Sequence, residues 1–265
     1  MVYEGWICGV GVLVYDAESI QALFSQGFGK GILSRSFPNH FTAEKNKKYL
    51  PDKQVESREA FHAKFISSQV HEATGNEIEA LQLNPVEAFY IKDIHRAFSI
   101  RLQSVGSSER DYNAPEVSVE ELWSLFVHRL GKRFIAEYCC FCNYRNMGWI
   151  VKGGMKYGVD YLLYSKGGPE LKHSQLAVSI HFIETLQSSK SIDVDRFQRM
   201  VQLQTLSRVT ETVSKGLLLS IVYKKSSDIL NQSNTTDDIY NPCILNSYCI
   251  KDFTINRWDP SKARE

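Results

Sequence analysis

The sequence lacks the features that mark several large classes of protein. No apolar run approaches the ~20 residues needed to cross a bilayer, and the apolar stretch 7–15 is too short, so we expect no membrane segment. The net charge is only +1, so no overall field indicates a polyanionic partner. A nucleic-acid site in this chain would therefore have to be a local basic patch.

The cysteines also lack the pattern of a disulfide framework or a zinc site. Six are present, and three of them, Cys139, Cys140 and Cys142, lie in one aromatic segment with helical character. No Cys/His pair follows at zinc-ligand spacing, which favours buried reduced thiols over a metal site. Such thiols fit a reducing compartment, either cytosol or nucleus.

What is present is the composition of a soluble globular protein. Hydrophobic residues make up 43% and charged residues 23% of the 265 residues, which separates the chain from disordered sequences. This length is enough for two modest domains.

The first part of the chain predicts strands and helices around a polar insert. Residues 9–15 have the character of a buried strand, and Asp16 can cap a helix that ends at Gly27. The glycine-rich segment 27–36, which contains Lys30, is either a solvated turn or a basic loop near RNA. Residues 37–76 are polar and contain one predicted helix, 58–73.

A clear helix start follows the insert. Asn84, Pro85 and Glu87 supply an N-cap, a proline in the first turn and the carboxylate of a capping box. This helix should run to about His95, and a strand follows over 98–102. The polar residues 104–114 mark a linker. We therefore predict a small N-terminal α/β domain with a polar insert, residues 1–114.

The second part predicts two helices, then strands and one more helix. Ser118 and Glu121 form a second capping box that opens one helix, and a second helix, 133–147, ends at Gly148. The other predicted elements are strands 149–152, 161–164, 176–183, 217–224 and 248–258 and a helix 194–207 capped by Asp193. This order predicts an α+β fold class, with a mixed sheet in a C-terminal domain, residues 115–265.

One hairpin in this domain carries titratable groups. The apolar strand 161–164 ends at Tyr164, a Gly-Gly-Pro turn follows, and His173 precedes the next apolar run. A phenol and an imidazole would thus lie on a rigid frame beside a loop.

This hairpin resembles the catalytic hairpin of the tRNA-splicing endonucleases. The family pattern is Lys-(Tyr/Phe)-Gly-x-Asp-(Phe/Tyr)-Leu-(Leu/Val)-Tyr, then a Gly-Pro turn, then His. It matches Lys156, Gly158, Asp160, Tyr164 and His173. The family's third motif, Val-Ser-Lys before a late strand, matches Val213-Ser214-Lys215. The loop between Tyr164 and His173 contains Glu-Leu-Lys, where the family pattern has more apolar residues.

The resemblance implies a nuclease-like α/β fold and a metal-independent endoribonuclease without a cofactor. In such an enzyme a base deprotonates a ribose 2′-hydroxyl, an acid protonates the leaving 5′-oxygen and a cation stabilises the phosphorane. By resemblance these are Tyr164, His173 and Lys215 respectively. The products would be 2′,3′-cyclic phosphate and 5′-hydroxyl ends. A phenol with pKa ~10 is a weak base at neutral pH unless a cation lowers that pKa.

The resemblance also implies two residues that hold RNA. Arg208 and Trp258 correspond to a guanidinium and an indole that together grip a flipped base. Two alternatives remain open: Trp258 as a core anchor, and Arg208 as a charge that complements the helix dipole.

The family further implies a precursor-tRNA substrate, a nuclear location and a heterotetramer with three related subunits. Segment 27–36 resembles the catalytic subunit assigned to the 5′ splice site. The other catalytic subunit, a non-catalytic structural subunit and a plain RNA-binding module are the alternatives. The final strand 248–255 offers an edge to a partner subunit, and Asp237-Asp238 corresponds to an acidic inter-subunit plug.

Overall fold

The computed structural model describes residues 3–32, 38, 79–96, 98–102, 112–183, 192–224 and 239–256. By its internal contacts the chain divides into two compact units, Met1–Arg129 and Leu130–Glu265. Each unit contains its own five-stranded mixed sheet with helices, so the α+β class is confirmed. Our sequence boundary at 104–114 lies earlier in the chain and stays a prediction. The predicted helix 58–73 lies outside the described residues.

The first unit contains one sheet in the strand order β3-β4-β2-β1-β5. Its one parallel pair is β1 with β5, while the other neighbours are antiparallel. The elements in chain order are β1 (Tyr3–Cys8), β2 (Gly11–Val14), α1 (Ala17–Ser25), β3 (Lys30–Gly31), β4 (Leu81–Leu83), α4 (Pro85–His95), β5 (Phe98–Leu102) and α5 (Val119–Leu130).

The predicted helix starts in this unit are confirmed by their caps. Asp16 accepts a hydrogen bond from Ser19 N–H at 2.8 Å. The capping box of α4 is complete, because Asn84 accepts from Glu87 N–H at 2.7 Å and Glu87 accepts from Asn84 N–H at 3.0 Å. Ser118 and Glu121 make the same reciprocal pair at the start of α5.

The predicted strand 9–15 is confirmed in shorter form as β2 (Gly11–Val14), but the strand before it, β1 (Tyr3–Cys8), was not predicted. The two strands form a hairpin. Gly9 has a φ of +59°, in the left-handed region that glycine adopts without a steric penalty. The turn therefore falls within an apolar run.

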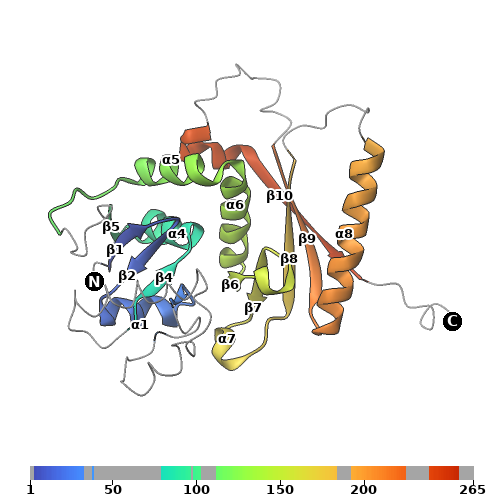
Figure 1. Ribbon diagram of the computed structural model, residues 1–265, viewed down its shortest axis with the longest axis horizontal. Coiled ribbons are helices and arrows are strands. Elements are labelled where there is room, and N and C mark those ends of the chain that lie inside the picture. The colour runs from blue at the N-terminus through green and yellow to red at the C-terminus, as the bar shows by residue number, and fades with distance from the viewer. Residues whose placement is uncertain are drawn as a thin grey trace, which may run out of the picture. The chain divides into compact units, whose positions relative to one another are not determined.

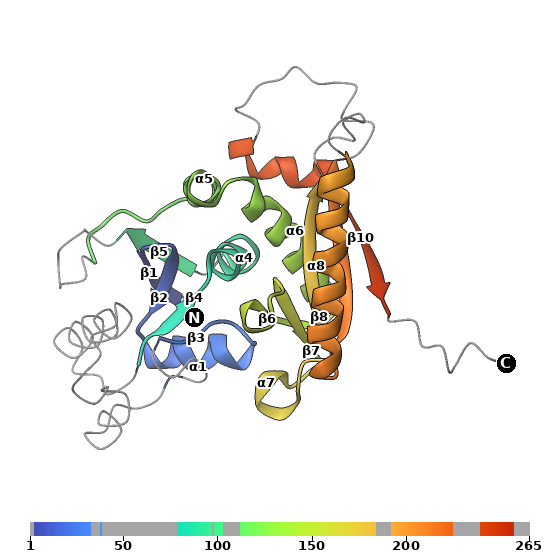
Figure 2. The same ribbon diagram turned by 45° about the vertical axis from the view of Figure 1, so that its right-hand side comes forward.

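The second unit is a sheet in the order β10-β9-β8-β7-β6, with α6 on one side and α8 on the other (Figure 1). Only β8 and β9 are parallel among these pairs. Figure 2 shows β10 at the outer edge of the sheet. The elements are α6 (Lys132–Asn146), β6 (Ile150–Gly153), η1 (Met155–Tyr157), β7 (Tyr161–Tyr164), α7 (Gly168–Leu171), β8 (Leu176–Ile183), α8 (Ile192–Thr212), β9 (Gly216–Lys224), η3 (Pro242–Ser247) and β10 (Tyr248–Ile255).

Candidate active site

The end of β7 and the starts of β8 and β9 lie together at one end of the strands of the second sheet. Because β7 and β8 are antiparallel, with Leu163 opposite Leu176, the end of β7 lies beside the start of β8. Because β8 and β9 are parallel, with Leu176 opposite Gly216, the start of β9 lies there too. Tyr164 is the last residue of β7, and Lys215 directly precedes β9.

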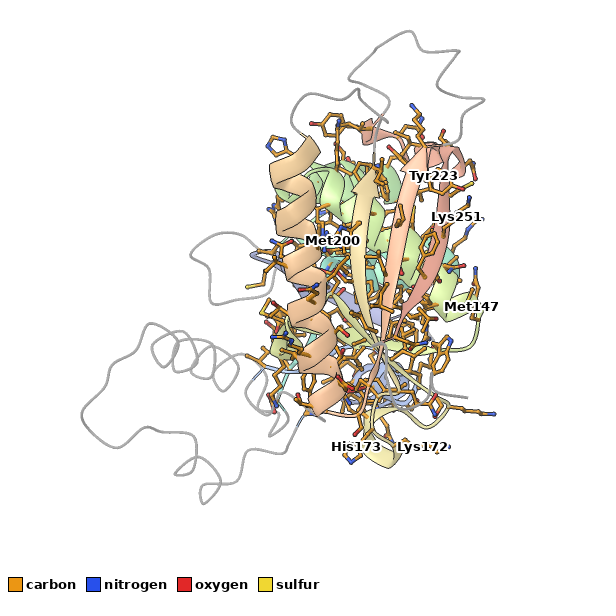
Figure 3. The ribbon with its side chains drawn as sticks, turned by 90° about the vertical axis from the view of Figure 1, so that its right-hand side faces the viewer. Met147, Lys172, His173, Met200, Tyr223 and Lys251 are labelled. Atoms are coloured by element: carbon orange, nitrogen blue, oxygen red, sulfur yellow. The ribbon has the colours of Figure 1, made fainter. Side chains whose placement is uncertain are left out.

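His173 lies in the loop that leads to the start of β8. The sheet therefore brings the three predicted residues, Tyr164, His173 and Lys215, to the same end of the strands. The imidazole of His173 is exposed and lies next to Lys172 at the end of the sheet near α7 (Figure 3). A substrate can reach it without displacing any part of the core. The short helix α7 within this loop was not predicted from the sequence.

Tyr164 is half-buried against a small apolar cluster. Its ring packs on the core formed by Val159, Leu162, Ala177 and Leu217. Burial raises the pKa of the Tyr164 phenol, while the Ser174 hydroxyl acts to lower it and the nearby Tyr157 phenol acts to raise it. A general base at this position therefore needs a neighbouring group that favours the phenolate.

Lys215 is held in place by the turn between α8 and β9. Its backbone N–H donates to the carbonyl of Thr210 at 2.9 Å, and the preceding Ser214 has a φ of +54°. The ammonium donates to the carbonyl of Ser174 at 3.1 Å and lies over the Tyr157 ring, 5.4 Å from its centroid. The cation is thus fixed at the same end of the strands as Tyr164.

Asp160 of the motif connects the β7–β8 hairpin to helix α6. Its carboxylate accepts from Ile180 N–H at 2.6 Å and pairs with Arg133. Arg133 also donates to the Ile180 carbonyl at 3.0 Å and to Glu137 at 2.9 Å. These bonds tie α6 to the β7–β8 pair. The motif contains Tyr157 and Asp160, but no sequence signal identified Arg133 or Ser174 as parts of the site.

Of the two predicted RNA-binding residues, only one lies in the described part of the chain. Arg208 is exposed on α8, seven residues before Lys215. The same helix packs against the apolar cluster through Leu206, so the Arg208 guanidinium belongs to an element that borders the site. Trp258 lies outside the described residues, as do Asp237 and Asp238. The pairing of Arg208 with Trp258 stays a prediction.

No group of three or more His, Cys, Asp or Glu residues that could hold a metal ion occurs among the described residues. All six cysteines are free thiols. Burial raises the pKa of Cys139 to about 12, so this thiol stays protonated at neutral pH. No described helix is long and apolar enough to cross a membrane.

Residues 134–230 match the family described as "tRNA intron endonuclease, catalytic C-terminal domain". This region contains β7, β8 and β9, and hence Tyr164, His173 and Lys215.

Several curated proteins are similar to the chain over longer stretches. It is 30% identical over 186 residues to the tRNA-splicing endonuclease subunit Sen2 of Mus musculus, covering 70% of this chain but 36% of the mouse protein. It is 24% identical over 327 residues to the probable tRNA-splicing endonuclease subunit sen2 of Schizosaccharomyces pombe, covering 96% of this chain and 84% of that protein. The similarity to SEN2 of Saccharomyces cerevisiae is 24% over 192 residues, with 71% and 43% covered. The chain thus spans little more than a third of the mouse relative.

Proposed function

We propose, from the match to the tRNA intron endonuclease catalytic domain and the similarity to Sen2 proteins, that this chain is an endoribonuclease subunit that cleaves precursor tRNA. The observation that carries the proposal is the sheet register. It brings the end of β7, the start of β8 and the start of β9 together, so that the Tyr164 phenol, the loop that carries His173 and the Lys215 ammonium lie at one end of the sheet. These three side chains are the groups that metal-independent RNA cleavage requires.

In the proposed reaction a ribose 2′-oxygen attacks the adjacent phosphorus. Tyr164, as phenolate, takes the 2′-hydroxyl proton, and His173 gives a proton to the 5′-oxygen as its bond to phosphorus breaks. The Lys215 ammonium stabilises the negative charge that develops on the phosphorane. The products carry a 2′,3′-cyclic phosphate and a 5′-hydroxyl. Every bond change is served by a side chain at this end of the sheet, so the mechanism has no step that uses a metal or a cofactor.

The 5′ splice site is the cut that we assign to this chain. Support comes from segment 27–36, which resembles the catalytic subunit assigned to that site. In the described part of that segment Gly29 donates its N–H to Glu87 of α4 at 3.2 Å, and Lys30 is exposed. A Cβ at Gly29 would lie 2.7 Å from the Leu81 side chain. The segment is thus anchored while its cation faces solvent. The 3′ splice-site subunit is the alternative assignment.

The edge strand β10 supports a place in a complex with related subunits. In the described part of the chain β10 pairs only with β9, which leaves its other edge open. Phe253 on this strand is 47% exposed, and the Lys251 ammonium lies over the Tyr223 ring, 5.6 Å from its centroid (Figure 3). We assign this edge to a partner subunit within a nuclear heterotetramer. In that complex Arg208 and Trp258 grip a flipped base of the substrate.

The chemistry is tested with the complex purified through this chain and an intron-containing tRNA precursor. Lys215→Ala should slow cleavage at one splice site by two orders of magnitude or more, because it removes the cation that faces the transition state. Lys172→Ala is the matched control, since Lys172 is an exposed lysine of the neighbouring loop, and it should cleave normally.

Chelation supplies the second arm of this test. EDTA should leave cleavage of a prefolded precursor unchanged, and the released ends should be cyclic phosphate and 5′-hydroxyl. Loss of activity with EDTA that trace metal restores would contradict the proposed mechanism, as would 5′-phosphate products.

A further inference from the structure

The hydroxyl of Ser174 is a buried polar group that has no part in the proposed roles of Tyr164, His173 and Lys215. Ser174 is only 5% exposed, and its Oγ has no hydrogen-bond partner among the described residues. A buried hydroxyl without a partner has lost its hydration and gained nothing in return. Such a group beside a proposed active site suggests a hydrogen bond that forms only in the reactive state.

Ser174 follows His173, bonds Lys215 and lies beside the end of β7 that carries Tyr164. Its carbonyl accepts the hydrogen bond from Lys215 Nζ at 3.1 Å. The next residue, Gln175, is bound on both sides: its N–H donates to the Leu163 carbonyl at 3.0 Å, and its carbonyl accepts from Gly216 N–H at 3.0 Å. The backbone at Ser174 is therefore fixed between the end of β7 and the start of β9.

We propose that Ser174 is a positioning residue whose hydroxyl donates a hydrogen bond to the phenolate oxygen of Tyr164, while its carbonyl holds the Lys215 ammonium. The part of this proposal that concerns catalysis rests on the role of Tyr164 as general base. The hydrogen bond forms best when Tyr164 is ionised, because donation to a charged oxygen is about twice as strong as donation to a neutral one.

The electrostatic setting of Tyr164 agrees with this geometry. Burial raises the pKa of the phenol, and the Ser174 hydroxyl opposes that effect. Titratable groups of the described residues at this end of the sheet include Tyr157 from η1, Lys172 and His173 before β8 and Lys215 before β9, whereas α8 and β10 contribute apolar Leu206 and Ile255 to the cluster. Ser174 is a neutral donor among them.

The proton balance leaves Ser174 unchanged. During the attack the 2′-hydroxyl proton moves to the Tyr164 oxygen, which becomes a neutral phenol. The hydrogen bond from Ser174 weakens at that point, and Ser174 neither gives up nor gains a proton. Its contribution lies in the fraction of Tyr164 that is ionised before the reaction.

The direct test is the ionisation of Tyr164 in the full chain. Tyrosine labelled with ¹³C at Cζ is titrated by NMR, and the Tyr164 signal is assigned by its loss in Tyr164→Phe. Ser174→Ala should lower the acid dissociation constant of Tyr164 about tenfold. Ser165→Ala is the control, because Ser165 also has a buried hydroxyl without a partner in the described residues and directly follows Tyr164. It should leave the ionisation unchanged.

Ser174→Ala removes one unpartnered atom, so the melting temperature should stay the same or rise. An unaltered ionisation of Tyr164 in this variant, or a clear loss of thermal stability, would overturn the proposal. The conservative variant Ser174→Thr keeps the hydroxyl and should restore the wild-type ionisation.

Activity in the purified complex separates this inference from the proposed function. Ser174→Ala should lower the maximum of kcat/KM about tenfold and move the alkaline limb of its pH profile to higher pH, while Ser165→Ala should do neither. If Tyr164→Phe still cleaves, the proposed function fails, but the NMR titration still decides whether Ser174 acts on Tyr164. If Tyr164→Phe is inactive and Ser174→Ala keeps the wild-type profile, the inference alone fails.

Discussion

Tyr164 is half-buried, and burial works against the charge that a general base must carry. Its apolar neighbours raise the pKa of the phenol. The Ser174 hydroxyl acts to lower this pKa, and the Lys215 ammonium is held at the same end of the sheet by its bond to the Ser174 carbonyl. In our proposal the basicity of Tyr164 therefore depends on its surroundings, which a strand-end tyrosine in isolation would not reveal.

The binding of a flipped nucleobase between Arg208 and Trp258 is a prediction about single residues. Stacking of a base on an aromatic ring contributes roughly 1–3 kcal/mol, or about one to two decades in rate. Arg208→Ala and Trp258→Ala should each slow cleavage by that order, at the splice site whose chemistry belongs to the partner subunit. The double variant should be less than additive, because the loss of one side of the grip already releases the base.

The measurement is a double-mutant cycle scored separately at the two splice sites, with the folded fraction of each variant checked by circular dichroism. Additive effects, or unfolding of Trp258→Ala, would show that Trp258 is a core anchor instead.

The sequence could indicate individual site residues only where a motif contains them. Tyr164, His173 and Lys215 stand at fixed places in three short motifs, and the register then brings them to one end of the sheet. Ser174 and Tyr157 act through space on Tyr164 and Lys215. No spacing in the chain encodes those contacts, because they depend on how the turns before β8 and β9 are folded.

At the scale of elements, a partly buried polar network joins α6 to β9 and β10. The Tyr144 hydroxyl donates to the Asp252 carboxylate at 2.9 Å and contacts the Ser220 hydroxyl, which itself donates to Asp252 at 2.7 Å. Tyr144 is buried, and burial raises the pKa of its phenol. The hydroxyl stays neutral and serves as a structural link to the edge strand.

Tyr144→Phe should therefore destabilise the chain by about 1–3 kcal/mol, because it leaves Ser220 and Asp252 without a partner that they now share. Urea unfolding followed by circular dichroism measures the loss. Tyr240→Phe is the control, since Tyr240 is 39% exposed, and it should change the midpoint little. An equal free energy of unfolding for Tyr144→Phe and wild type would mean that the network does not stabilise the packing of β10.

Most helix starts with an explicit cap signal could be predicted, but Asp193, the expected cap of the late helix, lies within α8, which begins at Ile192. The caps at Asp16, Asn84 and Ser118 gave correct helix starts, because a side chain there satisfies backbone N–H groups. The β1–β2 hairpin was missed because its turn at Gly9 interrupts an apolar run without a polar signal. Helix α8 extends to Thr212, beyond the predicted end at 207, since no glycine or proline ends it earlier.

At the scale of the whole molecule, the open edge of β10 and the proposed catalytic centre both indicate that the chain acts together with a related subunit. A precursor tRNA with two splice sites needs two centres, and the described part of this chain provides one set of converging phenol, imidazole and ammonium groups. The second centre therefore belongs to a related subunit in our proposal. The edge strand, with its exposed Phe253, offers a surface that such a subunit can extend by strand pairing.

The most direct measurement is cleavage by the complex that contains His173→Ala, scored at each splice site of one precursor. His173 is exposed in a loop, so assembly should be intact, and the loss of the general acid should abolish one cut while the other proceeds at the wild-type rate. The 5′ cut is the one that we expect to disappear. Retention of both cuts, or an equal loss of both in a complex that assembles normally, would contradict the assignment of one catalytic centre to this chain.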